Sequence, residues 1–191
     1  MRASGKDKVL IQKEKYFIAL VPPDPLQEKL MDLKRLVKSE FQSSHALRSP
    51  AHITLAMPFQ YRPEKEENLF RTLEKYLVGF DSFPVSLKGF GFFPPRVVFV
   101  AVEENPALKK LQEAVVSCCR EKLGLFHSNY RDRPFHPHIT IGFRDLKPQA
   151  FEAAGKYFEN RDFREVFTCG SVAVLKLFSA GWKEIKSIPL R

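Results

Sequence analysis

Residues 51–59 (AHITLAMPF) and residues 135–143 (FHPHITIGF) are two copies of one pattern, a His-Ile-Thr tripeptide followed by apolar residues at every second position. The tripeptide begins at His52 in the first copy and at His138 in the second. One such tripeptide is weak evidence, since it occurs by chance in many proteins. Two copies, each opening an alternating segment at the same place in a repeated unit, indicate a shared role.

The alternation is typical of a β-strand with one face in the core, because successive side chains of a strand point to opposite faces. The apolar positions are predicted to face the core, and they are Ile53, Leu55, Met57 and Phe59 in the first copy and Ile139, Ile141 and Phe143 in the second. The opposite face then presents a histidine, a threonine and a small residue from each copy, namely His52, Thr54 and Ala56, and His138, Thr140 and Gly142. The small residues would leave room for a ligand.

Each strand therefore presents an imidazole and a hydroxyl about 6–7 Å apart along its axis. If the two strands face each other across a cleft, two imidazoles and two hydroxyls converge. One neutral histidine can accept a proton while the other, protonated, donates one, because the pKa of an unperturbed imidazole is about 6.5. This arrangement favours phosphodiester cleavage without a metal, in which His52 and His138 transfer protons and the hydroxyls of Thr54 and Thr140 bind the phosphate.

The elements around the motif also repeat, in the order strand, helix, His-Ile-Thr strand, helix, strand. Strands are expected at residues 16–21, 52–59, 83–90, 97–102, 138–143, 163–167, 172–178 and 182–188, and helices after the prolines at positions 25, 63, 106 and 148. The buried face of the first helix, which should end by about Gln42, is predicted to be Leu26, Leu30, Leu33 and Val37. The repeat indicates a single domain, residues 1–191, made of two lobes at roughly 15–90 and 96–178, with a C-terminal hairpin arm at 172–190.

The composition narrows the class of protein. The chain has 191 residues, 44% of them hydrophobic, and a formal net charge of +9, which favours an anionic partner such as nucleic acid. No apolar run approaches the roughly 18 residues that span a bilayer, and the polar residues 1–15 do not have the pattern of a signal peptide. The three cysteines lack the spacing of a disulfide framework or a zinc finger. We therefore expect a cytoplasmic monomer without a membrane partner, a metal or a cofactor.

The two motifs resemble the signature of the two-histidine (2H) phosphoesterases, a pair of H-x-[T/S] segments each followed by a hydrophobic residue. Within that superfamily the chain is similar to the bacterial and archaeal 2′-5′ RNA ligases, the LigT-like family, whose members also act as RNA 2′,3′-cyclic phosphodiesterases. The resemblance covers nearly the whole chain from Tyr16 onward. It implies an α+β, bilobal fold with pseudo-twofold duplication, in which two antiparallel sheets line a central cleft and the helices lie outside.

The resemblance also implies metal-independent opening of 2′,3′-cyclic phosphates on RNA or nucleotides, usually leaving a 2′-phosphate, and reversible 2′-5′ RNA ligation. The partner would be an RNA or nucleotide with a 2′,3′-cyclic phosphate or a 2′-5′ linkage. His52 and His138 are then the catalytic residues, with the acid role on His52 and the base role on His138. Thr54 and Thr140 become the phosphate-binding residues.

Further residues near the motifs are candidates for substrate contacts. Arg131 and Arg133 precede the second motif and Arg48 precedes the first, and arginine binds phosphate with two parallel hydrogen bonds. His136 falls on the same strand face as His138 and is a candidate substrate contact. A His-x-His pair can also bind zinc, although no further ligand follows at a familiar spacing. The alternative interpretation is a solvated loop side chain for the arginines and a structural role for His136.

Three other functions stay open. An RNA-binding module with the same basic cleft would show salt-dependent binding and no product. A metallohydrolase built on His52, His136 and His138 would contain stoichiometric zinc and lose its activity to a chelator. A phosphodiesterase for a cyclic nucleotide or an ADP-ribose cyclic phosphate would use the same residues and differ in substrate alone.

Overall fold

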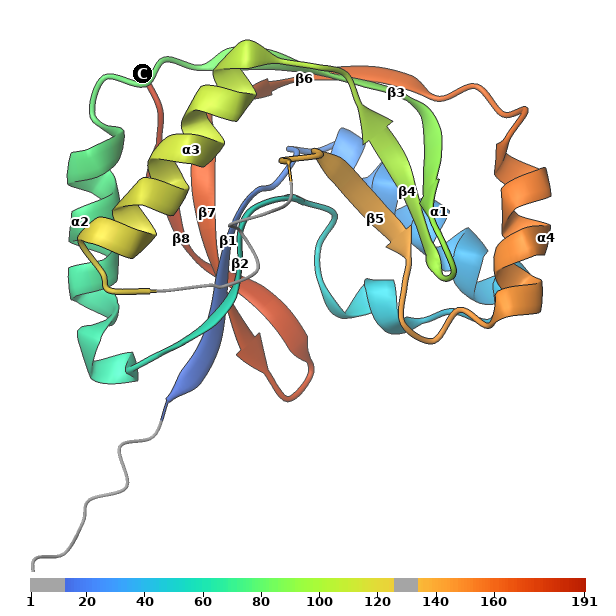
Figure 1. Cartoon of the computed structure of the whole chain (residues 1–191), viewed down its shortest axis with the longest axis horizontal. Coiled ribbons are helices and arrows are strands. Elements are labelled where there is room, and N and C mark those ends of the chain that lie inside the picture. The colour runs from blue at the N-terminus through green and yellow to red at the C-terminus, as the bar shows by residue number, and fades with distance from the viewer. Residues whose placement is uncertain (1–12, 126–133) are drawn as a thin grey trace, which may run out of the picture.

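The computed structural model describes residues 13–125 and 134–191. This part of the chain forms one curled antiparallel sheet of eight strands with helices on its outer side (Figure 1). The strands lie in the order β6-β3-β4-β5-β2-β1-β7-β8. Their bounds are β1 Glu14–Leu20, β2 Ile53–Tyr61, β3 Phe83–Phe93, β4 Val97–Val102, β5 His138–Gly142, β6 Arg164–Cys169, β7 Ser171–Phe178 and β8 Gly181–Pro189.

The helices begin near the four prolines where the sequence predicts their starts. The α-helices are α1 Leu26–Phe41, α2 Glu66–Leu77, α3 Pro106–Glu121 and α4 Pro148–Phe158, and the 3₁₀ helices are η1 His45–Arg48 and η2 Pro63–Lys65. Asn105 caps α3, because its side chain accepts a hydrogen bond from the backbone N–H of Leu108 at 3.1 Å. The corresponding start of α1 has no side-chain cap. In the described part of the chain no helix has the length and apolar character needed to cross a membrane.

The α+β class is as expected, but the prediction of two separate sheets is wrong. The two motif strands, β2 and β5, are neighbours in the middle of a single sheet. They are joined at the pair Ile53 and Ile139, so the two halves of the sheet meet at the motifs themselves. Each half contains four strands, which read outward from the middle as β5, β4, β3, β6 and as β2, β1, β7, β8.

The chain crosses between these halves. β3 follows β2 in sequence but pairs with β4 and β6, and β7 returns to pair with β1. The helices cross in the same way: α1 packs on β5 beside α4, and α3 packs on β2 beside α2 (Figure 1). The β7–β8 hairpin ends the chain. The strands β3 to β6 therefore form one half, and the first two and last two strands form the other.

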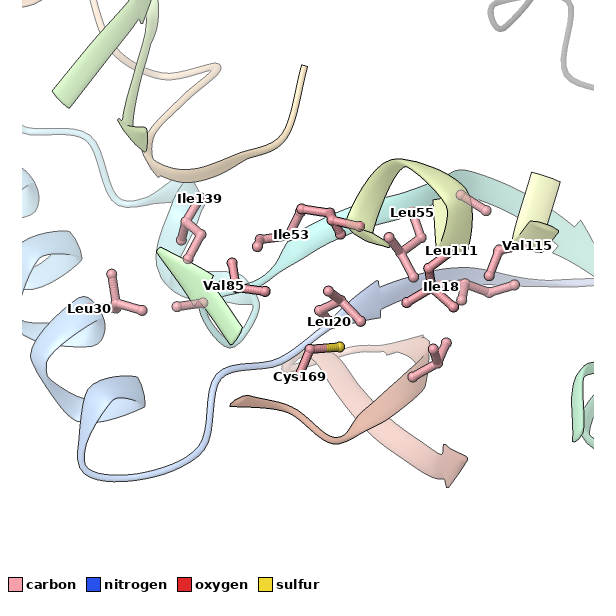
Figure 2. Packing of buried hydrophobic residues seen from close by; sticks show 14 of the residues in the cluster. Ile18, Leu20, Leu30, Ile53, Leu55, Val85, Leu111, Val115, Ile139 and Cys169 are labelled. Carbon is pink, nitrogen blue, oxygen red and sulfur yellow. The ribbon is translucent and has the colours of Figure 1, made fainter. Parts of the chain in front are cut away.

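One hydrophobic core runs behind both motifs. Ile53 and Ile139 are fully buried, and they belong to a cluster that includes Leu30 of α1 and Leu111 of α3. Figure 2 shows this continuity, with Ile139 and Ile53 between the side chains of the two halves. A second, smaller cluster lies apart from it and is formed by Phe17, Ala19, Ala173 and Leu175, with Val21 and Trp182 packed against it.

The alternation predicted for the motif strands holds beyond the tripeptides at Leu55, Phe59 and Ile141, which are buried as expected, but it fails at one point in β2. Met57, predicted to face the core, is 46% exposed, whereas Ala56 is buried in the core cluster. The cause is a pair of register shifts between β1 and β2 around Ile18, which interrupt the alternation locally. Gly142 also differs from expectation, because a Cβ there would lie 3.1 Å from Cγ1 of Val37. This glycine makes room for α1 rather than for a ligand.

Candidate active site

The two histidines lie at the start of the two central strands. His52 directly precedes β2, and His138 is the first residue of β5. The pairing of Ile53 with Ile139 places the two tripeptides on neighbouring strands of one sheet, rather than on two sheets that line a cleft. The two rings are close enough that the charge on His138 affects the pKa of His52.

Both rings are held in the same way. Nδ1 of His52 lies 2.8 Å from the carbonyl oxygen of Pro50, and Nδ1 of His138 lies 2.7 Å from the carbonyl oxygen of His136. A carbonyl can only accept, so Nδ1 carries the proton in each ring. In the neutral ring Nε2 then has a free lone pair and can take up a proton. Each histidine is thus fixed as the tautomer that a base requires.

Aromatic side chains support each ring. The ring of His52 packs against Phe17 of β1 at a centroid distance of 4.7 Å, and Phe17 packs edge-on against Trp182 at 4.7 Å. The ring of His138 packs against both Phe93 and Phe99, at centroid distances of 5.1 and 5.0 Å. These contacts limit rotation of both imidazoles and shield them from water.

The surroundings favour the neutral form of both histidines. Burial is the main cause that lowers the pKa of His52, to about 4, and the charge on Lys34 lowers it further against the hydrogen bond to Pro50. Burial also lowers the pKa of His138, opposed by its hydrogen bond to the His136 carbonyl. The free site therefore contains two neutral imidazoles at neutral pH, and His52 resists protonation strongly.

The two threonines occupy the positions that the motif predicts. Thr54 and Thr140 are half-buried, and they pair with Ala19 of β1 and Phe99 of β4 in the sheet. Within residues 13–125 and 134–191 neither hydroxyl forms a hydrogen bond to another side chain or to the backbone. Both hydroxyls can therefore donate to a bound anion.

The secondary candidates have different outcomes. Arg131 and Arg133 lie outside the described residues. Arg48 is exposed on η1, and its guanidinium donates to the carbonyl oxygen of Ser179 at 3.4 Å. His136 is exposed and lies beside His138, with 6.3 Å between the ring centroids. In the described part of the chain no group of three or more His, Cys, Asp or Glu side chains is placed to hold a metal ion.

The sequence pattern missed one residue next to the site. Lys34, not Leu33, continues the buried face of α1, and its side chain is only 1% exposed. Lys34 follows Leu30 by four residues and precedes Val37 by three, so this spacing alone places it on the same helix face as those two residues. A helix face predicted from apolar residues leaves out a lysine, so the prediction placed Leu33 on the buried face instead of Lys34.

The comparisons with known proteins agree with this geometry. The model of the 2′-5′ RNA ligase superfamily matches residues 22–178. A protein of Geobacillus sp. (strain WCH70) named as a phosphoesterase is 31% identical over 185 residues, which cover 89% of this chain and 98% of the relative. An RNA 2′,3′-cyclic phosphodiesterase of Thermotoga maritima is 29% identical over 152 residues, 77% of each chain.

Solved structures show the same fold. The crystal structure of E. coli LigT complexed with 3′-AMP has a TM-score of 0.67 at 20% identity and covers 94% of this chain and 99% of LigT. The complex of E. coli LigT with NADP+ has a TM-score of 0.68 at 21% identity, with the same coverage. Because the family model matches most of this chain, the chain belongs to the 2′-5′ RNA ligase superfamily and is an enzyme of the 2H phosphoesterase kind.

Proposed function

We propose that this enzyme hydrolyses 2′,3′-cyclic phosphates on RNA or nucleotides with His52 and His138 as its two proton-transfer groups. The observation that carries the proposal is the matched pair of imidazoles, each with Nδ1 bonded to the carbonyl two residues earlier and with Nε2 not hydrogen-bonded to any residue of 13–125 or 134–191. The substrate class is supported by the relative from Thermotoga maritima, which is named for RNA 2′,3′-cyclic phosphate, and by the 3′-AMP complex of E. coli LigT.

The proposed reaction is a displacement at phosphorus. One histidine takes a proton from a water molecule through Nε2 while the water oxygen forms a bond to phosphorus. The bond from phosphorus to the ribose O3′ breaks, and the other histidine, entering as imidazolium, gives its proton to O3′. The hydroxyls of Thr54 and Thr140 donate to the non-bridging oxygens. The product carries a 2′-phosphate and a free 3′-hydroxyl.

The electrostatics of the site favour His52 as the base. The resemblance to known families implied the opposite assignment, with His52 as the acid. Burial and the nearby charge of Lys34 lower the pKa of His52 to about 4. His52 therefore stays neutral above that pH and is available as a proton acceptor. His138 is the better acid, because no lysine or arginine in the described part of the chain lowers its pKa. An anionic substrate next to His138 would favour its imidazolium form.

The same ring-opening step accepts a second nucleophile in this proposal. When an RNA 5′-hydroxyl replaces water, its oxygen bonds to phosphorus, the bond to O3′ breaks and O3′ takes up a proton, which gives a 2′-5′ linkage and a free 3′-hydroxyl. We therefore extend the proposal to 2′-5′ RNA ligation at high concentrations of RNA ends. The proton-transfer groups would be the same two histidines.

The first experiment is a product assay on the four nucleoside 2′,3′-cyclic phosphates and a 2′-5′-linked oligonucleotide, with and without EDTA. We expect a 2′-phosphate product at a rate that EDTA does not change. Salt-dependent RNA binding without any product would instead identify a binding module. Loss of activity to EDTA, restored by zinc, would identify a metallohydrolase.

A second experiment assigns the two roles. A substrate with sulfur in place of O3′ has a leaving group that needs no proton, so it bypasses the acid but not the base. We expect this analogue to restore turnover to His138→Ala and not to His52→Ala. Rescue of His52→Ala alone would return the acid role to His52.

A further inference from the structure

Lys34 is a buried cation with an unusual set of partners. It lies in the middle of α1, and its side chain is 1% exposed. Its ammonium donates to three backbone carbonyl oxygens, those of Ala46 at 3.0 Å, Ser49 at 3.0 Å and Pro50 at 3.1 Å. An ammonium has three donors, and all three are used on one short segment of chain.

That segment leads directly into the first motif. The carbonyl oxygen of Pro50 accepts from Nζ of Lys34 at 3.1 Å and from Nδ1 of His52 at 2.8 Å. The ammonium and the imidazole therefore donate hydrogen bonds to the same oxygen atom. A carbonyl oxygen has two lone pairs, so it can serve both donors at once.

We propose that Lys34 is a positioning residue for the reaction of the two histidines, which holds the Pro50 carbonyl in place and through it fixes His52 with Nε2 toward the substrate. The proposal rests on the proposed function, since it concerns the same imidazole. Lys34 does not itself touch the substrate in this scheme. It acts through one backbone carbonyl.

The segment before His52 needs such a support because it is held mainly by side chains. Gln27, two turns before Lys34 on α1, forms two hydrogen bonds with the backbone of Ala51, at 3.0 and 3.2 Å. Lys34 holds the preceding residues from the same helix. Without these contacts the backbone before β2 has no sheet partner to fix the Pro50 carbonyl.

The second histidine lacks an equivalent support. The His136 carbonyl accepts from Nδ1 of His138 at 2.7 Å, and no lysine or arginine of the described residues donates to it. Among the described residues, a cation bonded to the carbonyl that orients the ring is therefore found at His52 and not at His138. This is one difference between the two rings on which distinct roles can rest.

The charge of Lys34 also acts on the ring. In the described part of the chain, the charged groups that influence His52 are Lys34 from α1 and His138 from β5, and both lower its pKa. Burial lowers the pKa of Lys34 itself to about 7, so it is charged below neutrality, which is where protonation of His52 must be resisted.

The test is Lys34→Met, with Lys38→Met as the matched control one turn further along α1, where the lysine is exposed. On a nucleoside 2′,3′-cyclic phosphate, Lys34→Met should lower kcat about tenfold and leave KM within about twofold, because the ring is misplaced while the phosphate site remains. The acidic limb of kcat/KM should move to higher pH by about one unit, because a cation next to His52 is gone. Lys38→Met should match the wild type.

A measurement on the wild-type protein covers the case that the variant fails to fold. The ¹⁵N resonances of the two imidazoles report which ring nitrogen carries the proton. We expect the His52 resonances to shift as Lys34 loses its proton at a pH of about 7, and those of His138 to show no step there. Lys34→Arg, which keeps a cation, should preserve the His52 tautomer.

The outcomes separate this proposal from the proposed function. A folded Lys34→Met protein with the wild-type tautomer, pH profile and kcat would overturn the role of Lys34 and leave the phosphodiesterase reaction standing. Absence of hydrolysis by the wild type would remove the proposed function, while the ¹⁵N titration would still decide whether Lys34 orients His52.

Discussion

Ile53 of β2 and Ile139 of β5, the central residues of the two tripeptides, lie opposite each other where the two halves of the sheet meet. Both are fully buried, and their flanking residues are the histidines and threonines of the site. The core and the candidate active site therefore share the same pair of residues. A change in how these isoleucines pack should reach both stability and catalysis.

Ile53→Ala and Ile139→Ala test this link. Each should lower the free energy of unfolding by about 2–5 kcal/mol, because each removes buried methyl groups and leaves a cavity. Each should also lower kcat in the fraction that stays folded, since the histidines move relative to each other. Urea unfolding and turnover measure the two effects. Met57→Ala, on the exposed side of the same strand, should change stability by less than about 1 kcal/mol.

Local signals in the sequence located the helices and motif strands well. Asn105 and Pro106 mark the start of α3, and Pro148 marks the start of α4, because caps and prolines act within one turn. The tripeptides also predicted that His52 and His138 start the two motif strands and share a face with the threonines, because strand alternation is a local property. The matched Nδ1 hydrogen bonds followed from the backbone and were not visible in advance.

Long-range features could not be obtained in this way. The merging of two expected sheets into one depends on the pairing of Ile53 with Ile139, and nothing near either residue specifies that partner. The exposure of Met57 depends on register shifts between β1 and β2. The role of Lys34 depends on the path of a loop that brings three carbonyl groups to one helix. Each is a property of two segments together.

The pH dependence of kcat/KM follows from the two lowered pKa values. With His52 as base, activity should rise as pH increases through about 4, where His52 becomes neutral. With His138 as acid, activity should fall as pH increases through its pKa, which lies below the usual value of about 6.5. The optimum is therefore expected on the acidic side of neutrality.

Variants identify the limbs of this profile. His52→Ala should lose the acidic limb and His138→Ala the alkaline limb, with turnover lower by roughly 10²–10⁴-fold in each. The fold should persist, as circular dichroism can check. An optimum above pH 8 in the wild type would contradict the assignment of these two groups.

Asp145 is predicted to stabilise the segment that leads to His52. It follows β5, and its carboxylate accepts hydrogen bonds from Oγ of Ser43 at 2.6 Å and from the backbone N–H groups of Ser44 and His45 at 2.9 and 3.0 Å. Asp145→Ala should cost about 1–2 kcal/mol in the free energy of unfolding, as loss of a helix cap does. Asp162→Ala, which removes only an exposed pair with Arg164, should cost less than about 1 kcal/mol.

The effect of Asp145 should depend on pH in a defined direction. Burial raises the pKa of Asp145, but the hydrogen bonds outweigh it and leave the pKa below its usual value. A carboxyl whose pKa is lowered on folding contributes stability above its unfolded pKa of about 3.9, and this is lost as pH falls through the folded value. The stability difference between wild type and Asp145→Ala should therefore shrink below about pH 4. A constant difference from pH 7 to pH 2 would contradict this.

Gly181 and Gly155 form a matched pair of glycine positions with opposite expected effects. Gly181 opens β8 at φ +134°, and a Cβ there would lie 2.4 Å from the backbone oxygen of Arg48. Gly181→Ala should lower the free energy of unfolding by about 1–3 kcal/mol and push the β7–β8 hairpin away from η1. Gly155 lies inside α4 with no heavy atom within 4 Å of its Cβ position, so Gly155→Ala should add about 0.5–1 kcal/mol. Urea unfolding of both variants measures the difference in the free energy of unfolding. If Gly181→Ala is as stable as the wild type, the backbone of Gly181 does not lie in close contact with Arg48.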